Sequence, residues 1–185
     1  MVAPAFSFAI AYKAAFAAQS MVKDQFLLPI ASRSIDKYNI ARDIILMKVV
    51  FDTDVIVSAL RSPSGASAEL LRRARLGTLQ FGASVALAME YEAICLRAEH
   101  VAAAGLSVHE VESFVDGLIA LATPVMVHYR WRPQLRDPGD EMVLEAAVNF
   151  GANALLSFNL RHFREAAQRF ELLVLTPGDF LRSLP

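Results

Sequence analysis

The chain has 185 residues, 55% of them hydrophobic and 20% charged. This composition is too apolar for a disordered chain, and the apolar runs are too short to span a membrane. A net charge of -1 argues against a broad basic face that binds nucleic acid by charge alone, so any contact with nucleic acid must be local. The single cysteine, Cys95, excludes an internal disulfide and any paired-cysteine metal motif, so we expect a protein of the reducing cytoplasm.

The sequence changes character near Met47. All four lysines lie within the first 48 residues, and arginine supplies every later basic charge apart from histidine. A regular alternation of strand-like and helix-like segments begins only at Met47. We therefore expect residues 1–46 to be an N-terminal extension outside the fold, and residues 47–185 to form one domain.

Five apolar runs with strand character alternate with segments of helical period, which predicts an α/β fold with a mostly parallel sheet. The expected strands are 48–51, 79–81, 124–129, 154–157 and 172–175. The expected helices are 67–76, 85–98, 107–122, a segment capped by Asp137 that ends before Gly151, and a terminal helix from Pro177. Ser107 and Glu110 form a capping box at the start of the third helix.

Asp52 directly follows the first expected strand, and Thr53 and Asp54 come next. In an open parallel sheet, ligands bind beyond the carboxyl ends of the strands, so an acid at this place is a candidate site residue. The alternative is that Asp52 only caps the next helix. We favour the site, because a carboxylate between apolar runs is costly unless a cation or hydrogen-bond donors satisfy it.

Glu90 interrupts the apolar stripe of the helix that follows the second expected strand. Leu87, Tyr91 and Ile94 form that stripe at helical spacing, and Glu90 lies within it. A carboxylate on the inner face of a helix indicates either a buried salt bridge or a residue that serves a pocket. The helix alone does not decide between these two.

Two further polar groups lie near predicted strand ends and helix starts. Asp137 and Asp140 belong to an acidic helix start, where acids complement the helix dipole without any function, although Asp140 also comes near the crevice. Ser157 and Asn159 follow the fourth expected strand. Carboxylates and an amide gathered at one sheet edge suit Mg²⁺ or Mn²⁺, and metal-assisted hydrolysis of a phosphate ester is the natural chemistry.

Taken together, these residues resemble the motifs of a PIN domain, the Mg²⁺-dependent ribonuclease fold of VapC-like toxins from toxin-antitoxin pairs. The similarity covers Met47 to about Leu184 and implies a three-layer α/β/α sandwich. Four motifs in the right order carry it: Asp52-Thr53-Asp54-Val55, Ser84 to Glu90, Arg136-Asp137-Pro138-Gly139-Asp140, and Ser157-Phe158-Asn159 continuing to Phe163.

By this resemblance Asp52, Glu90 and Asp140 take the metal-binding and catalytic acid positions, and Asn159 takes the place of a fourth acid. The chain departs from the pattern twice, because Asp54 stands where Asn is usual and Asn159 where many relatives have Asp. The first change adds a carboxylate and the second removes one, which weakens a second metal position.

Supporting roles follow from the same resemblance. Thr53 and Ser157 are expected to contribute hydroxyls beside the acids, and Asp137 is a possible substitute for the missing fourth acid, although it is expected mainly to cap the helix. Arg136 and Arg161 are expected to contact substrate phosphates.

The resemblance also implies partners: single-stranded RNA as substrate, a homodimer, and a cognate antitoxin protein. Tyr129 and Trp131 have the chemistry to stack a base, but contact with the core or with a second copy is the plainer interpretation.

Two other functions compete with a ribonuclease. A strand followed by Asp52-Thr53-Asp54-Val55 also resembles the first motif of haloacid-dehalogenase-like phosphatases, but the chain has no lysine after Lys48 for their basic position, and Glu90 is then unexplained. A catalytically weakened PIN binding module is the other, suggested by Asn159 alone. The four histidines are too scattered in sequence to indicate a site.

Overall fold

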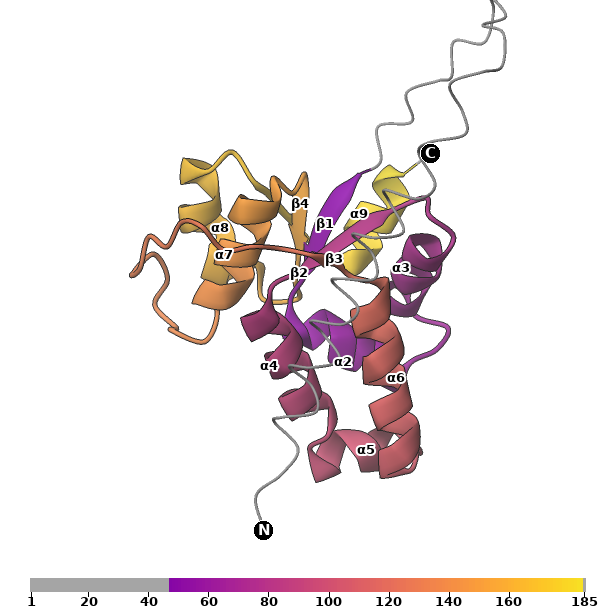
Figure 1. The fold of residues 1–185 in the computed structure, drawn as a ribbon. Coiled ribbons are helices and arrows are strands. Elements are labelled where there is room, and N and C mark those ends of the chain that lie inside the picture. Colours follow the sequence, from indigo (N-terminus) through magenta and orange to yellow (C-terminus); the bar gives the residue numbers. More distant parts are fainter. Residues whose placement is uncertain (1–46, 185) are drawn as a thin grey trace, which may run out of the picture. The chain divides into compact units, whose positions relative to one another are not determined.

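A parallel sheet of five strands organises residues 47–184, the part of the chain that the computed structural model describes (Figure 1). The strands are β1 (Lys48–Phe51), β2 (Gln80–Ala83), β3 (Thr123–Pro124), β4 (Ala154–Leu156) and β5 (Leu173–Leu175), in the order β3-β2-β1-β4-β5. All neighbouring strands run parallel, which confirms the predicted α/β fold. The predicted extension, residues 1–46, lies outside the described residues.

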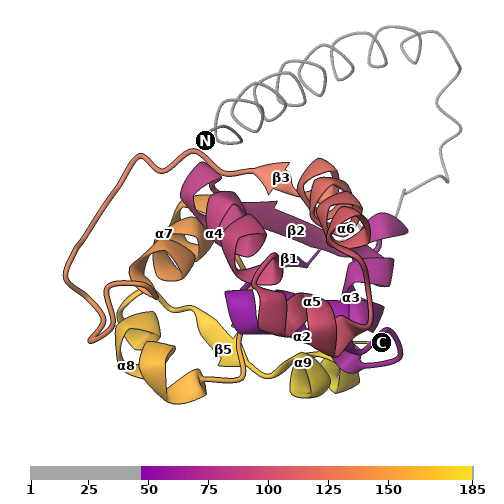
Figure 2. The same ribbon diagram turned by 90° about the horizontal axis from the view of Figure 1, so that it is seen from below.

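Helices surround this sheet. They are α2 (Thr53–Arg61), α3 (Ala66–Arg75), α4 (Val85–Cys95), α5 (Ala98–Ala104), α6 (Val108–Leu121), α7 (Glu141–Phe150), α8 (Leu160–Arg169) and α9 (Pro177–Ser183). Figures 1 and 2 agree in placing α7 and α8 on one side of the sheet and α3, α6 and α9 on the other. The helices α2 and α4, which directly follow β1 and β2, lie beyond the carboxyl ends of the strands. Within residues 47–184, no helix has both the length and the apolar character needed to cross a membrane.

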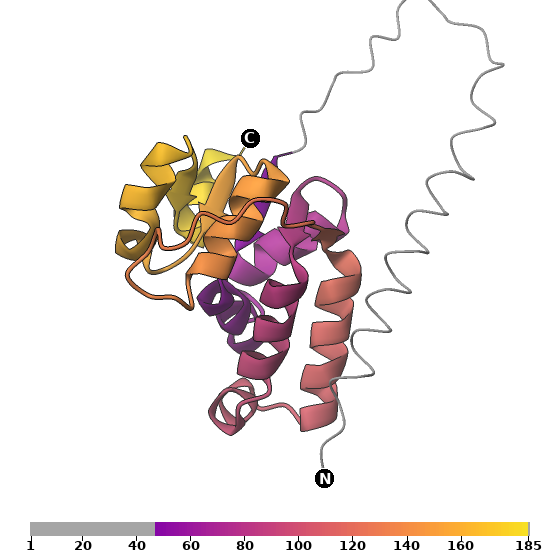
Figure 3. The same ribbon diagram turned by 60° about the vertical axis from the view of Figure 1, so that its left-hand side comes forward.

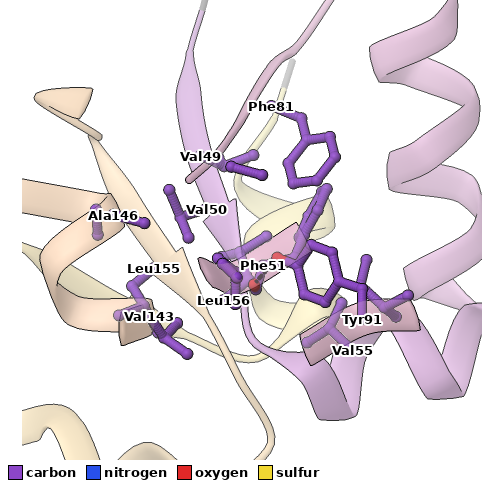
Figure 4. Packing of buried hydrophobic residues seen from close by; sticks show 14 of the residues in the cluster. Val49, Val50, Phe51, Val55, Phe81, Tyr91, Val143, Ala146, Leu155 and Leu156 are labelled. Carbon is purple, nitrogen blue, oxygen red and sulfur yellow. Dashed lines mark hydrogen bonds between the residues drawn. The ribbon is translucent and has the colours of Figure 1, made fainter. Parts of the chain in front are cut away.

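The central strand β1 is buried on both faces, which is why its sequence is a continuous apolar run rather than an alternating one. Val49 and Phe51 point to one face and Val50 to the other (Figure 4). Phe51 meets Phe81 of β2 with ring centroids 4.9 Å apart. On the other face Val50 lies on the side of α7, toward Ala146 (Figure 4). The core therefore holds the carboxyl end of β1 in a fixed place.

Gly82 of β2 allows α7 to approach the sheet closely. A Cβ atom at this position would lie 2.5 Å from the ring of Phe150, the last residue of α7. Gly151 then ends the helix in the left-handed conformation, with φ of 62°. These two glycines fix where α7 lies, and hence where its N-cap residue Asp140 lies.

Four helices, α2, α4, α5 and α8, differ from the predicted pattern. The helices α2 and α8 were not among the expected elements, and the helix expected over 85–98 ends at Cys95, with α5 as a separate helix after it. The α2 sequence is rich in β-branched residues, which by themselves favour strands. Burial of Val55 and Ile56, both 0% exposed, outweighs that local preference.

The segment between β3 and α7 also differs from the prediction. The strand expected over 124–129 is reduced to Thr123–Pro124, because its only partner, β2, ends at Ala83. The predicted helix start at Asp137 is wrong as well, since α7 begins at Glu141 with Asp140 as its N-cap. Asp137 instead accepts a hydrogen bond from the Gly139 backbone N–H at 2.9 Å, in a local turn.

Candidate active site

Asp52 lies where β1 passes into α2, and its carboxylate is buried, with 6% of the residue exposed. One oxygen accepts a hydrogen bond from the Thr53 backbone N–H at 2.7 Å, and the other accepts from the Ser157 hydroxyl at 2.6 Å. Ser157 is at hand because β1 and β4 are parallel neighbours with Phe51 opposite Leu156, so the next residue of each strand lies at the same edge. The polar residues that follow β1 and β4 thus lie together at one edge of the sheet, as predicted.

Asp54 shares this edge and is less well satisfied. Its Oδ2 accepts from the Phe158 backbone N–H at 3.0 Å and from the Asn159 side-chain amide at 3.3 Å. Its Oδ1 is buried and, within the described part of the chain, has no hydrogen-bond partner. A buried carboxylate oxygen without a donor is costly, and it is the kind of atom that a cation satisfies.

Burial disfavours the ionisation of both carboxylates at this edge. Burial, and after it the charge of Asp54, raise the pKa of Asp52 to about 7, although the hydrogen bonds from Ser157 and Thr53 act in the opposite direction. Burial also raises the pKa of Asp54. The charge of Asp140 adds a smaller increase to the pKa of Asp52, so Asp140 belongs to the same electrostatic group.

Asp140 stands at the N-terminus of α7 and is paired with His162 of α8. The His162 Nδ1 lies 2.9 Å from Oδ2 of Asp140. Burial raises the pKa of Asp140, and the hydrogen bond from His162 opposes that rise. Sequence spacing alone does not single out His162; its place one helical turn after Asn159 is the only signal that it faces the same site.

Glu90 is placed differently from the other predicted acids. It is half-buried on α4, and within residues 47–184 its side chain makes no hydrogen bond or ion pair. The next residue, Tyr91, is fully buried and donates a hydrogen bond to the Phe51 carbonyl, which fixes α4 against the end of β1. Burial raises the pKa of Tyr91 well above its usual value, and the Asp52 charge adds to this.

The remaining predicted residues lie around these acids. Thr53 contributes its backbone N–H to Asp52. Asn159 contributes its side-chain amide to Asp54. Arg136 and Arg161 line a pocket of about 440 Å³ together with Asp137 and His162. The pocket therefore adjoins the Asp140–His162 pair, where an anionic substrate would meet both arginines.

The donor set suits a hard divalent cation. Among residues 47–184, no three acidic, histidine or cysteine side chains form a ready metal-binding cluster. Asp52, Asp54 and Asp140 nevertheless form one electrostatic group, and the unpartnered Oδ1 of Asp54 is the oxygen that most needs a cation. Carboxylate oxygens are the ligands that Mg²⁺ and Mn²⁺ prefer, so the residues present fit such an ion.

A comparison with family models matches residues 48–161 to the PIN domain. The chain belongs to the PIN-domain family. The match runs from β1 into α8 and includes each acid discussed above, so the resemblance inferred from the motifs is confirmed at the level of the family. PIN domains are nucleases that generally use divalent metal ions, which leaves the phosphatase interpretation without support.

Among solved structures, the chain is similar to VapBC2 from Rickettsia felis, crystallised bound to a DNA fragment from their promoter. The two share 12% sequence identity with a TM-score of 0.48, over 70% of this chain and 97% of the other. No curated protein matches the sequence.

Proposed function

We propose that this PIN domain is a metal-dependent endoribonuclease that cleaves single-stranded RNA. The observation that carries the proposal is the buried Asp52 carboxylate at the end of β1, beside Asp54 with its unpartnered oxygen. Buried acids whose pKa values are raised in this way are unfavourable for stability alone, and such groups are typical of functional sites.

Asp52 and Asp140 would hold a Mg²⁺ or Mn²⁺ ion, with Asp54 beside them and Glu90 as the further acid that the family motifs imply. When bound, such an ion activates water near neutral pH and stabilises the charge that develops on a phosphodiester during hydrolysis. Ser157 holds Asp52 in orientation through its 2.6 Å hydrogen bond, and His162 does the same for Asp140. Arg136 and Arg161, at the neighbouring pocket, would bind the flanking phosphates.

Water is the expected nucleophile rather than the RNA's own 2′-hydroxyl. The latter reaction needs a general base and a general acid, which a pair of histidines or a lysine commonly supplies. The chain has no lysine after Lys48, and the one histidine at the site, His162, is engaged with Asp140. The products would carry a 5′-phosphate and a 3′-hydroxyl.

The biological role proposed here is that of the toxin of a toxin-antitoxin pair in the cytoplasm, acting as a homodimer and inhibited by a cognate antitoxin. The motif resemblance to VapC-like toxins supports this role. An apolar groove of about 710 Å³ between α2, α3 and α6 gives independent support for a protein partner. Its apolar lining includes Leu60, Leu71, Phe114 and Leu118.

The test is end-group analysis of a labelled single-stranded RNA incubated with the full chain, with and without chelator. We expect internal cleavage with 5′-phosphate ends that stops on chelation and in an Asp140→Asn variant. Cleavage that survives chelation, or 2′,3′-cyclic phosphate ends, would contradict the mechanism. Hydrolysis of a small phosphomonoester with the RNA left intact would return the assignment to a phosphatase.

A PIN domain that binds RNA without cleaving it is the second candidate. The Asn159 amide donates to Asp54 instead of adding a carboxylate, so the site lacks the fourth acid that many relatives have. Metal-independent RNA binding with no cleavage in Mg²⁺ or Mn²⁺ would favour this candidate. Cleavage in either ion would exclude it.

A further inference from the structure

Two aromatic side chains are exposed on the segment between β3 and α7. Tyr129 is 64% exposed and Trp131 is 41% exposed. Their rings are stacked, with centroids 5.4 Å apart and planes inclined by 22°. Phe170 contacts the Trp131 ring from the end of α8, at 5.3 Å between centroids. We call Tyr129 and Trp131 the aromatic shelf.

The segment that carries this shelf has no regular structure but is held firmly to α7. The Asn149 side chain accepts hydrogen bonds from the backbone N–H groups of His128 and Tyr129, both at 3.0 Å, and donates to the Tyr129 carbonyl. Arg132 makes two hydrogen bonds to Glu145, at 2.8 and 2.9 Å. Figures 1 and 3 show the segment running along α7. The exposed rings are therefore fixed in position.

The shelf is continuous with the pocket of the candidate active site. Gln134 joins them, because it lines the 440 Å³ pocket with Arg136 and Arg161 and also donates a hydrogen bond to the Trp131 carbonyl. Arg169 in turn donates to the Gln134 side chain at 3.0 Å. A continuous surface thus runs from His162 past arginines to exposed aromatic rings.

We propose that the aromatic shelf is a nucleobase-stacking subsite for single-stranded RNA; this inference rests on the proposed function. Exposed aromatic rings beside arginines bind single strands by stacking bases while the cations meet the phosphates. Arg136 and Arg161 make no ion pair within residues 47–184 and remain available to phosphates. Duplex bases are already stacked on one another, so the shelf selects unpaired bases. It would hold a nucleotide a short distance along the strand from the phosphate that is cleaved.

Trp131 is the only tryptophan of the chain, so intrinsic fluorescence reports on the shelf directly. The full chain in chelator, where cleavage is prevented, is titrated with a single-stranded oligoribonucleotide, with an abasic strand of equal length, and with a duplex. We expect saturable quenching by the single strand only. Quenching by the abasic strand to the same extent would overturn base stacking.

Variants separate the shelf from general charge attraction. Anisotropy of a labelled single strand should show about tenfold weaker binding for Tyr129→Ala and for Trp131→Ala, and near-normal binding for Tyr129→Phe and Trp131→Phe. Leu76→Ala, at a 76% exposed residue of the α3 C-cap, is the matched control. Thermal unfolding of each variant checks that it is folded, and the aromatic replacements keep the test valid if an alanine variant is not.

The failure of this inference can be told from failure of the proposed function. Quenching without cleavage in Mg²⁺ or Mn²⁺ supports the subsite and rejects the nuclease. RNA cleavage together with unchanged RNA binding in both alanine variants supports the nuclease and rejects the subsite. Absence of RNA binding also rejects the subsite. Trp131 emission that changes with protein concentration in the absence of RNA, together with loss of self-association in Trp131→Ala, would instead make the shelf an interface between two copies.

Discussion

Asp52 and Glu145 are buried to the same extent, each 6% exposed, but their charges are met in different ways. Glu145 receives both arms of the Arg132 guanidinium, at 2.8 and 2.9 Å. Asp52 receives a hydroxyl and a backbone N–H but no cationic side chain from residues 47–184, and it lies beside a second acid. Burial alone thus does not mark a functional carboxylate; uncompensated charge does.

Glu141, 3% exposed, extends the same contrast. Its Oε1 accepts from the backbone N–H groups of Gln134 and Leu135, at 2.6 and 2.9 Å. Glu141 and Glu145 lie one turn apart on α7 and together fix the segment that carries the aromatic shelf. Glu141 and Glu145 therefore stabilise the fold. Asp52 and its neighbouring acids instead lower the stability of the fold, and a bound cation would relieve that cost.

The largest effect should follow from removing the Asp52 charge. We expect Asp52→Asn to lower RNA cleavage by about 10³-fold, which corresponds to about 4 kcal/mol of transition-state stabilisation. The amide oxygen still accepts from the Thr53 N–H, and the amide NH2 can donate to the Ser157 hydroxyl, so the fold should remain. Initial rates of cleavage measure the effect, with Glu99→Gln, at an exposed acid on α5 that lies outside the pocket lined by Arg136 and Arg161, as control. Equal rates for Asp52→Asn and wild type would mean that the charge of Asp52, like that of Glu145, is not needed for cleavage.

The same variant should be more stable than wild type at high pH in chelator. The folded state holds the Asp52 proton up to about pH 7, whereas the unfolded chain releases it near its ordinary pKa of 3.8. The folded state therefore binds more protons between these values, and the free energy of unfolding falls as pH rises through them. At pH 8 we expect Asp52→Asn to be more stable by roughly 1–4 kcal/mol.

Denaturant unfolding at pH 5 and pH 8 measures this difference. The variant should lose less stability between the two pH values than wild type does. A pH dependence identical to that of wild type would mean that Asp52 is ionised throughout and that its charge is already compensated.

Removing the Glu145 charge should have the opposite sign. Glu145→Gln leaves the half-exposed Arg132 without its partner, and we expect a loss of about 1–3 kcal/mol in the free energy of unfolding. The matched control is Glu165→Gln, whose acid is 86% exposed and pairs with Arg169 at 3.7 Å, and whose loss should stay below about 0.5 kcal/mol. Equal losses of unfolding free energy in the two variants would mean that the buried Glu145 pair contributes no more stability than an exposed ion pair.

The smallest effect is expected from shortening the chain. The acids around Asp52 and the pair Glu141 and Glu145 all lie in residues 47–184, and the predicted pattern of strands and helices begins at Met47. We therefore propose that residues 1–46 are dispensable for folding and for activity. A chain that begins at Met47 should unfold cooperatively, within about 0.5 kcal/mol of the full chain, and cleave RNA at the same rate. Loss of either property would assign residues 1–46 a part in the fold or the site.

The sequence predicts those parts of the molecule where local and tertiary preferences agree. The apolar runs of β1 and β4 and the Ser107 capping box at α6 appear as expected. The helix α8 was missed because its sequence is mostly polar, although Phe163, Ala166 and Ala167 form a buried stripe at helical spacing. The strand expected over 124–129 failed because an edge strand extends only as far as its partner does.

The site was predictable to the extent that topology alone determines it. Asp52 and Ser157 meet because each follows one of two neighbouring parallel strands. The His162 contact with Asp140 joins helices from two different crossovers, so it depends on how they pack. The Arg132 pair with Glu145 depends on the path of an irregular segment, which no periodicity encodes.

We expect the acids around Asp52 to bind a divalent cation and the acids Glu141 and Glu145 not to bind one. Thermal unfolding of the full chain during titration with Mg²⁺ and Mn²⁺ tests this most directly. Wild type and Glu145→Gln should both gain stability in proportion to ln(1 + [metal]/Kd), whereas the melting temperature of Asp52→Asn should barely change. An equal metal-induced shift in Asp52→Asn, or no shift in wild type, would contradict the account.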